Sequence, residues 1–483
     1  MKQLKNSLFH SFLFNYSSKI LGITVSLILA RIITPNEYGT FALALVFAGI
    51  GDLLNNFGVV DFLIKEKELT SNKIETAFGL IIITCILTAS LLFAIAPLVG
   101  DFYGNETITE LIQILTISVL FAPFGSITNA ILRRNSEFKK LGIAQICTEI
   151  GGLLITLGLA WFGWGVYALA LGFVAKSILL VICYHFFKVN ETPAKPEFKG
   201  VSDILSYSSF ATLSGIVSHF GNSSQYWIMG KALNMESIGF YSRAVSTVDL
   251  YNQVITQSLS PVMSSFFANS NRTEPDQLSR QYTKLVQVES SIAWPFFIFL
   301  GFHADAAVQI LWGDQWGFIA EFLMYLCIAK AISIVTSHAP NVLLMLGKSK
   351  VLFKVNLLIN IILVIAIFLS VEHGVKAVAV TICFVSSFCR ILLFLACLKK
   401  YISLDFSKLF FSLIFSVMVS FISILVLLFW HYYSPLNSVI FEAFISSFTL
   451  LISWVFFNWI FNTYFYKEFL KKYYEVAFKK LFP

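Results

Sequence analysis

Five cationic side chains stand inside long apolar stretches of this sequence, where charged residues are rare. They are Lys19, Lys176, Arg243, Lys330 and Arg390. An ionisable residue in the middle of a membrane-spanning helix costs about 2.5 to 3.5 kcal/mol on insertion scales, so it is retained where it faces a cavity or a partner. Arginine binds phosphate oxygens through two parallel hydrogen bonds, and lysine binds them as a mobile point charge. The five cations predict a cavity for an anionic head group, with ion pairing between helices as the alternative.

Acidic side chains occur in the same apolar stretches. They are Asp52, Glu149, Asp249, Glu289 and Glu321. We expect Glu149, Asp52 or Asp249 to be able to take up a proton or a cation and so couple transport to an ion gradient. The alternative is a carboxyl group that simply stays protonated among its apolar neighbours.

Two neutral polar residues, Asn222 and Gln225, share one apolar stretch with Ser223, Ser224 and Tyr226. Their amides could hydrogen-bond the hydroxyl groups of a sugar. Packing between helices through small polar residues explains them equally well. Histidines occur at positions 10, 219, 303 and 338, and we assign them no role.

Several kinds of chemistry have no support in this sequence. There is no P-loop, no G-x-S-x-G and no H-E-x-x-H. The seven cysteines form no C-x-x-C pair and no metal-ligand spacing with histidine. We therefore expect no cofactor, no metal site and no enzymatic activity. The net charge of +7 lies in short loops between apolar segments, which is an orientation signal of membrane proteins and not a nucleic-acid site.

The elements that must position these residues are membrane-spanning helices. The 483 residues are 57% hydrophobic and 13% charged, roughly half the charged share of a soluble domain, with a mean hydropathy of +0.78. Because one crossing needs about 20 apolar residues, we predict an all-α polytopic membrane protein of about fourteen transmembrane helices. The predicted helices span 7–33, 39–64, 74–99, 107–132, 141–162, 165–187, 203–230, 236–268, 281–303, 316–346, 350–371, 375–398, 407–430 and 437–465.

The distribution of basic residues predicts the orientation of these helices. With the N-terminus in the cytoplasm, most of the 34 Lys and Arg residues fall in loops on that side, which is the rule for membrane proteins. We therefore expect a bacterial cytoplasmic (inner) membrane protein with both termini in the cytoplasm. The 236–268 helix is long enough to tilt, to kink at Pro261 or to project from the membrane.

The order of the predicted helices indicates an internal repeat. The block around Gly39 resembles the block around Gly239, and the block that starts at Gly165 resembles the one that starts at Gly374. We predict two six-helix lobes in parallel orientation with a substrate cavity at their interface. The expected parts are an N-terminal lobe at 1–188, a cytoplasmic linker at 189–202, a C-terminal lobe at 203–400, and two additional helices with a basic tail at 401–483.

Several short blocks also occur in the order and spacing of a known family. They are Leu29–Gly39, which reads Leu-Ala-Arg-Ile-Ile-Thr-Pro-Asn-Glu-Tyr-Gly, then Phe57–Gly58, Leu69–Thr70, Phe102–Gly104, Leu132–Arg134, Phe138–Lys139, Trp164–Leu169, Gly239–Ala244, Gly313–Trp316 and Leu346–Lys348. Through them the chain, over about residues 7–400, resembles the Wzx-type polysaccharide transporters. These are the O-antigen and exopolysaccharide flippases of the multidrug, oligosaccharidyl-lipid and polysaccharide exporter superfamily.

The resemblance implies a function. The substrate would be an undecaprenyl-pyrophosphate-linked oligosaccharide, carried from the inner to the outer leaflet by alternating access, with membrane lipids and other polysaccharide-assembly proteins as partners. Many members of the family carry an acid in the seventh helix where this chain has Gln225. At this position the chain departs from the family's pattern.

Three other functions fit part of the pattern. An ion-coupled multidrug exporter of the same superfamily would favour acids over cations in its cavity. A membrane polysaccharide polymerase or ligase would present a large extracytoplasmic loop, and no such loop is expected here. A scaffold for other glycan enzymes would need no cavity at all.

Overall fold

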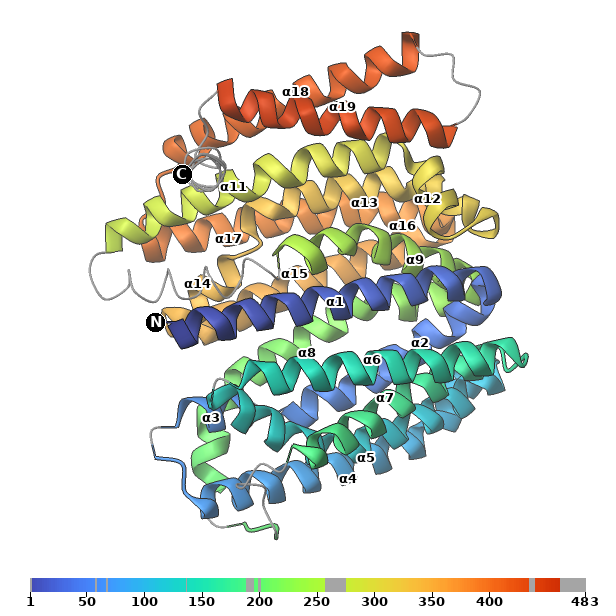
Figure 1. The fold of residues 1–483 in the computed structure, drawn as a ribbon, viewed down its shortest axis with the longest axis vertical. Helices are drawn as coiled ribbons and strands as arrows, with labels where there is room; N and C mark the ends of the chain where they lie inside the picture. Colours follow the sequence, from blue (N-terminus) through green and yellow to red (C-terminus); the bar gives the residue numbers. More distant parts are fainter. Residues whose placement is uncertain are drawn as a thin grey trace. The chain divides into compact units, whose positions relative to one another are not determined.

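The chain folds into helices of very different lengths (Figure 1). The computed structural model describes residues 2–56, 59–66, 68–135, 137–187, 195–198, 201–256, 275–433 and 439–460. The α-helices are α1 (Lys2–Ile32), α2 (Pro35–Asn56), α3 (Val59–Lys65), α4 (Ser71–Tyr103), α5 (Glu106–Arg134), α6 (Phe138–Trp161), α7 (Val166–Phe186), α8 (Val201–Ala232), α9 (Met235–Tyr251), α11 (Pro275–Phe302), α12 (Ala304–Leu311), α13 (Ala320–Ser333), α14 (Ala339–Met345), α15 (Ser349–Ser370), α16 (Gly374–Thr381), α17 (Ser387–Ile402), α18 (Phe406–Tyr433) and α19 (Val439–Ile460). No strand occurs among the described residues, and the all-α prediction is confirmed.

Eight helical segments in the described part of the chain are long and apolar enough to cross a membrane. They are Ser71–Tyr103, Glu106–Arg134, Phe138–Trp161, Val166–Phe186, Gln277–Phe302, Asp314–Met345, Ser349–His373 and Val375–Ile402. Shorter apolar stretches follow at Phe406–Ile422 and Ile445–Phe456. The protein is therefore a multi-pass membrane protein, and the count of fourteen crossings stays a prediction.

Helices divide into two compact units, which we describe separately. Unit 1 holds residues 1–242 and 349–372, and unit 2 holds residues 243–348 and 373–483. Helices α8 and α15 thus belong to unit 1, because α8 packs against both α2 and α15. The lobe boundaries expected from the repeat stay a prediction. Most of the 189–202 linker, Pro261 and the basic tail after 460 lie outside the described residues.

Unit 1 is a bundle in which sequential helices pack side by side. In it α4 packs on α5, α6 packs on α7, and α1 covers α6 (Figure 1). The turn between α4 and α5 is tight because Gly104 adopts a left-handed conformation at φ +64°. The side chain of Asn105 then accepts a hydrogen bond of 3.1 Å from the backbone nitrogen of Thr107 and caps α5. Gly104 and Asn105 thus allow α4 and α5 to pack side by side in opposite directions.

The structure places equivalent local features at the two anchors of the sequence repeat. Thr34 and Glu37 form a reciprocal capping box at the start of α2, and the Asn234 side chain caps α9 by accepting from the backbone nitrogen of Ser237 at 2.8 Å. At the second anchor, Gly165 before α7 and Gly374 at the start of α16 both have positive φ, +49° and +88°. A side-chain cap at the first anchor and a glycine with positive φ at the second thus recur about 200 residues apart.

Unit 2 combines long helices with irregular segments. Figure 1 shows α18 and α19 packed against each other beside α11, and α11 also packs on α13. Several segments depart from α-helical geometry, among them the π-helix η1 (Asn252–Thr256), the 3₁₀-helix η3 (Ile334–Thr336) and the π-helix η5 (Ile382–Ser386). Two further 3₁₀ turns occur. They are η2 (Asp314–Ile319) in unit 2 and η4 (Val371–His373), whose first two residues belong to unit 1. Irregular backbone at membrane depth persists where it lines a cavity or lies inside the protein, so these segments point to the site.

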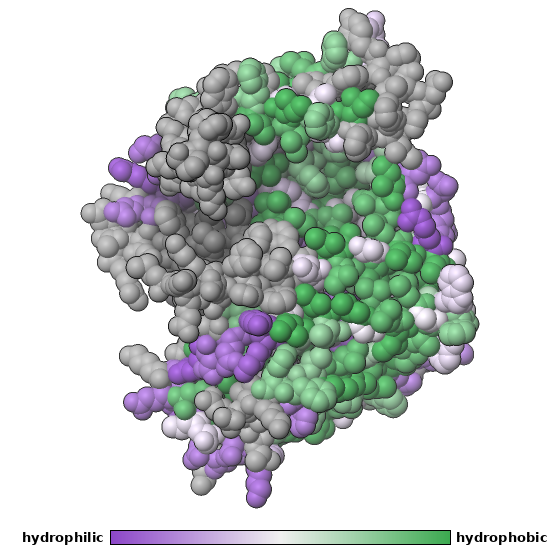
Figure 2. Space-filling view, in the orientation of Figure 1, coloured by the Kyte–Doolittle hydropathy of each residue, from purple (hydrophilic) through white to green (hydrophobic). Residues whose placement is uncertain are grey.

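The outer faces of the helices are hydrophobic. Over α4 to α7 the surface in view is almost continuously hydrophobic, with hydrophilic residues gathered near the helix ends (Figure 2). Leu87, Leu98 and Leu154 keep 65%, 67% and 66% of their surface exposed. Such exposure would be unfavourable in water, and it is what lipid-facing helices require.

Candidate functional site

A polar cavity of about 230 Å³ lies inside unit 2, between helices that are irregular at this depth. Asn252 and Thr256 of η1 line one side, and Thr336 and Ser337 at the end of η3 line another. The π-turn and the 3₁₀-turn interrupt the regular ladder of backbone hydrogen bonds and direct hydroxyl and amide groups into the cavity. The walls therefore offer hydrogen bonds to a small polar group.

Two of the five predicted cations, Lys330 of α13 and Arg390 of α17, line this cavity. The Nζ atom of Lys330 lies 2.5 Å from Oδ1 of Asp249, on α9. The Lys330 side chain is 38% exposed and that of Asp249 31%, so the pair borders an open space instead of being sealed in the core. Lys330, Arg390 and Asp249 were predicted to act at a site, and the structure brings the three to one part of unit 2.

A buried acid adjoins the cavity. Glu289 of α11 is fully buried, and its Oε2 atom lies 2.9 Å from Nε2 of His338. The hydroxyl groups of Thr256 and Ser337, both in the cavity wall, donate to the two carboxylate oxygens of Glu289 at 2.7 and 3.1 Å. Tyr251 donates to the backbone oxygen of Glu289 at 3.2 Å. This cluster was missed as a functional group by sequence reasoning, which noted Glu289 only as an acid in an apolar stretch and gave His338 no role.

Arg243 has different surroundings from the other two cations of unit 2. It is 1% exposed, and its guanidinium carbon lies 4.6 Å from the ring centroid of Trp312 and 5.3 Å from that of Trp316. The indole nitrogen of Trp312 donates to Thr247 at 2.8 Å, and the Thr247 hydroxyl donates to the Arg243 carbonyl at 2.8 Å. Arg243 is thus packed between aromatic rings and is not part of the lining of the polar cavity.

The predicted site residues of unit 1 are spread over several helices. Lys176 of α7 and Glu149 of α6 form an ion pair with a distance of 2.7 Å between Nζ and Oε2. Lys19 lies on α1 and is partly exposed. Gln225 is buried and donates to the backbone oxygen of Asn222 on its own helix, α8, whereas the Asn222 side chain is exposed. The side chain of Asp52 lies outside the described residues.

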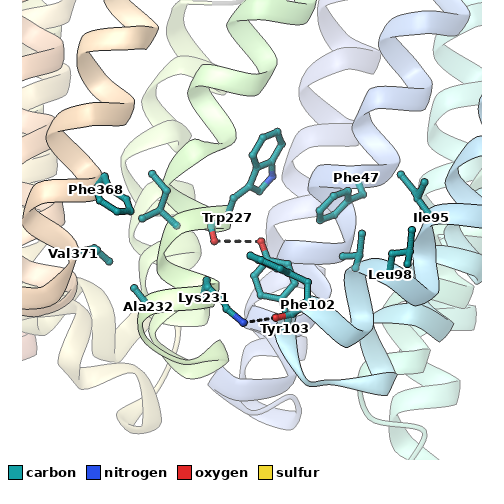
Figure 3. A pocket seen from close by; sticks show the side chains of 12 residues that line it. Phe47, Ile95, Leu98, Phe102, Tyr103, Trp227, Lys231, Ala232, Phe368 and Val371 are labelled. Atoms are coloured by element: carbon teal, nitrogen blue, oxygen red, sulfur yellow. Dashed lines mark hydrogen bonds between the residues drawn. The ribbon is translucent and has the colours of Figure 1, made fainter.

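Unit 1 contains an apolar cavity of about 520 Å³ (Figure 3). Its aromatic walls come from α2, α4, α8 and α15, with Phe47, Tyr103, Trp227 and Phe368 among them. Phe47 and Trp227 stack with their centroids 6.0 Å apart, and Tyr103 donates to the Trp227 carbonyl at 3.2 Å. Lys231 is the charged residue of the lining. Its amine donates to the Phe102 carbonyl at 2.6 Å and lies 4.4 Å from the centroid of that ring.

Comparison with known proteins identifies the family. The family model described as "Polysaccharide biosynthesis protein" (Polysacc_synt_3) matches residues 28–321, which is more than half of the chain. This chain belongs to the polysaccharide biosynthesis protein family. The resemblance drawn from the short sequence blocks is confirmed.

Individual proteins of known name match over about two thirds of the chain. The lipopolysaccharide biosynthesis protein WzxC of Escherichia coli (strain K12) is 22% identical over 342 residues, 70% of this chain and 68% of that protein. The succinoglycan biosynthesis transport protein ExoT of Rhizobium meliloti (strain 1021) is 25% identical over 332 residues, 68% of this chain and 66% of that protein. A solved structure of the lipid II flippase MurJ in an inward closed conformation superposes with a TM-score of 0.75 at 15% identity, covering 95% of this chain and 99% of that one. At that identity the superposition shows a common fold.

Neither cavity has the features of a metal centre. Among the described residues, no three His, Cys, Asp or Glu side chains gather closely enough to hold a metal ion. What the polar cavity of unit 2 offers is positive charge and hydroxyl groups, and what the cavity of unit 1 offers is aromatic surface.

Proposed function

We propose that this protein is a flippase that moves an undecaprenyl-pyrophosphate-linked oligosaccharide from the inner to the outer leaflet of a bacterial cytoplasmic membrane for the synthesis of a surface polysaccharide. Membership of the polysaccharide biosynthesis protein family and relatives named as transport proteins support it. The fold shared with a lipid II flippase agrees with it. The predominance of Lys and Arg in loops on one side supports cytoplasmic N- and C-termini.

The observation that carries the proposal is the polar cavity of unit 2. Lys330 and Arg390 reach a common space inside segments long and apolar enough to cross a membrane. Placing two cations there is costly unless an anion or a carboxylate compensates them. Asp249 compensates Lys330 in part, and two cationic side chains beside hydroxyl and amide groups suit the binding of a phosphate group. At about 230 Å³ the cavity is below the usual range of about 300 to 1,000 Å³ for drug-sized ligands, which suits a diphosphate head group better than a drug.

The aromatic cavity of unit 1 suits the other half of such a substrate. A hydrocarbon chain against Phe47, Trp227 and Phe368 would gain close packing contacts with these side chains, which are the interactions available inside a bilayer. We assign it to a stretch of the isoprenoid chain of the lipid-linked oligosaccharide.

The roles proposed for the other cations follow from their contacts. Lys176 is compensated by Glu149 and Arg243 is packed between two indoles, so we assign both to the stability of their units. Lys19 keeps its predicted role in head-group binding as a proposal, as do Asn222 and Gln225 in sugar contacts.

The decisive experiment is a flipping assay with the full chain in proteoliposomes. A fluorescent lipid-linked oligosaccharide is added, and a membrane-impermeant quencher reports the leaflet in which it lies. Wild-type protein is expected to exchange the lipid between leaflets, and Lys330→Gln and Arg390→Gln are expected to slow this at least about tenfold, which corresponds to about 1.4 kcal/mol.

The matched control is Lys376→Gln, which removes an exposed lysine at the start of α16. It should flip lipid at the wild-type rate. If the two cavity variants are folded and also flip at that rate, the cavity does not bind the head group. If the wild type extrudes cationic drugs and does not flip the lipid, the protein is a drug exporter.

A further inference from the structure

The strongest unassigned feature of the molecule is the pair formed by Glu289 and His338. Both side chains are almost fully buried, at 0% and 4% exposure, and both belong to segments long and apolar enough to cross a membrane. The distance of 2.9 Å between Oε2 and Nε2 requires a hydrogen atom between them. When the carboxyl group is ionised, this hydrogen is the Nε2–H of the neutral imidazole.

The pair can hold one proton more. With a single proton shared between a carboxylate and a neutral imidazole, its net charge is −1. Uptake of a second proton gives either imidazolium with carboxylate or imidazole with a carboxylic acid, and the net charge becomes zero. A net charge is expensive at a buried position, so the preferred state depends on the charges nearby.

The titratable and charged residues around the pair lie on several helices. Tyr251 and Asp249 lie on α9, Tyr282 lies on the same helix as Glu289, Lys330 lies on α13 and Arg390 on α17. Helix α18 also packs on α11 and contributes Ser416, which bonds Ser290 and does not titrate in this range. The cations in the cavity lining are Lys330, which pairs with Asp249, and Arg390.

One hydrogen bond separates the pair from the cavity. Thr256 and Ser337 line the space between Lys330 and Arg390 and at the same time donate to the two oxygens of Glu289. A phosphate bound in that space would lie one hydroxyl group away from the Glu289 carboxylate. Two anions so close repel each other more strongly inside a protein than they would in bulk water.

We propose that the Glu289–His338 pair is a proton-binding site coupled to anion binding in the polar cavity of unit 2. A diphosphate that enters the cavity raises the proton affinity of the pair, which takes up one proton from solvent, and release of the diphosphate returns that proton. By thermodynamic reciprocity, protonation of the pair tightens diphosphate binding by the same factor. This inference rests on the proposed function, since it takes the cavity as the head-group site.

The sequence-based candidates for ion coupling were Glu149, Asp52 and Asp249, and the structure pairs two of them with lysines. Glu289 differs from them because its partner is a histidine and not a lysine.

Isothermal titration calorimetry tests the coupling directly. Inorganic pyrophosphate is titrated into the purified full chain at one pH, in buffers that differ in their enthalpy of ionisation, so that the number of protons taken up on binding is measured. We expect the wild type to take up about one proton more per pyrophosphate than Glu289→Gln, which keeps the shape of the side chain and cannot titrate. The protons contributed by pyrophosphate itself are common to both proteins and cancel. Raising the pH by one unit should weaken pyrophosphate binding in both proteins to different extents. The wild type should lose up to about tenfold more affinity than Glu289→Gln.

A second measurement needs no variant of Glu289. Infrared difference spectra of the wild type with and without pyrophosphate should show the appearance of a carboxylic acid or an imidazolium band, and His338→Gln should remove the imidazolium band. Equal proton uptake by the wild type and Glu289→Gln, or spectra with neither band, would overturn the inference.

The outcomes also separate this inference from the proposed function. If pyrophosphate binding depends on Lys330 and Arg390 but takes up no extra proton, only the coupling is wrong. If pyrophosphate does not bind, or binds independently of those two cations, both the coupling and the head-group site are wrong.

Discussion

Gly39 and Gly239, which occupy equivalent positions in the sequence repeat, lie against each other in unit 1. A Cβ atom on Gly39 would overlap the carbonyl oxygen of Met235 and lie 2.7 Å from the backbone nitrogen of Gly239. A Cβ atom on Gly239 would overlap the carbonyl oxygen of Pro35 and lie 3.2 Å from the backbone nitrogen of Gly39. Each residue thus meets the other's helix in the same way, which is the reciprocity expected at a two-fold axis. The starts of α2 and α9 touch backbone to backbone, and only glycine allows that.

Replacing either glycine by alanine should separate the two helices. We expect Gly39→Ala and Gly239→Ala each to lower the thermal midpoint of the purified protein and to slow lipid flipping several-fold, because backbone atoms cannot move aside as a flexible side chain can. The matched control is Gly22→Ala on α1, where an added Cβ meets nothing within 4 Å. This control should be neutral or slightly stabilising, since alanine is the better helix former by about 0.5 to 1 kcal/mol. Equal midpoints for all three variants would show that the approach of α2 and α9 is dispensable.

The ion pair between Lys330 and Asp249 leads to opposite expectations for its two members. Asp249→Asn leaves Lys330 without its carboxylate and should tighten pyrophosphate binding about tenfold, whereas Lys330→Gln should weaken it by a similar factor, about 1.4 kcal/mol in each direction. Calorimetric titration with pyrophosphate measures both. Asp305→Asn, which changes an exposed carboxyl group on α12, serves as the control. Weaker binding by Asp249→Asn would instead favour a direct role of this acid, such as the ion coupling expected from the sequence.

The sequence was sufficient for the membrane class, the helical fold and the family, because each depends on composition and local order. Hydropathy along the chain is a property of short windows. The family blocks, such as Leu29–Gly39, need only be present in order. The repeat also was visible, and the structure puts the two glycines of its first anchor, Gly39 and Gly239, in contact with each other.

The sequence was not sufficient for the partners of the charged residues. The cost of burying Lys176 predicted that it must face a cavity or a partner, but the rotation of α7 against α6 decides that Glu149, 27 positions earlier, is that partner. His338 comes close to Glu289 only because η3 breaks the helix between α13 and α14. A 3₁₀ break has no strong sequence signal, and the one hint was the run Thr336-Ser337-His338 inside an apolar stretch.

The pair of Lys176 and Glu149 should behave as a structural contact. The stem of Lys176 lies against Gly152, so α6 and α7 are close at this point, and the pair is 36% and 25% exposed. Lys176→Met and Glu149→Gln should each lower the unfolding free energy by about 1 kcal/mol, and the double variant should lose less than the sum, because neither charge is then left alone. Thermal unfolding of the four proteins measures the coupling. A double variant that is stable yet no longer flips lipid would return Glu149 to the list of ion-coupling residues.

The two cavities should respond to different parts of the substrate. Trp227→Ala and Phe368→Ala enlarge the aromatic cavity of unit 1, and we expect them to raise the half-saturating concentration of a long-chain lipid-linked oligosaccharide several-fold. Binding of inorganic pyrophosphate, which has no hydrocarbon chain, should be unchanged in both. Leu154→Ala, on the exposed face of α6, controls for the loss of an apolar side chain elsewhere in unit 1. Reduced pyrophosphate binding in Trp227→Ala would contradict this division.

Arg243 offers a test between substrate binding, which the sequence predicted, and packing, which its contacts favour. The planar guanidinium lies over two indole rings at 4.6 and 5.3 Å and is 1% exposed, an arrangement that a lysine ammonium reproduces poorly. We expect Arg243→Lys to lower the unfolding free energy by about 1 to 2 kcal/mol, as seen in the thermal midpoint, and to leave pyrophosphate affinity at the wild-type value. Trp316→Phe should lower the unfolding free energy less than Trp312→Phe. The Trp316 variant keeps an aromatic face at the longer of the two distances, whereas the Trp312 variant also loses the hydrogen bond to Thr247. If Arg243→Lys kept its stability and lost pyrophosphate binding, the guanidinium would be a ligand of the head group after all, because packing alone cannot change affinity while leaving stability intact.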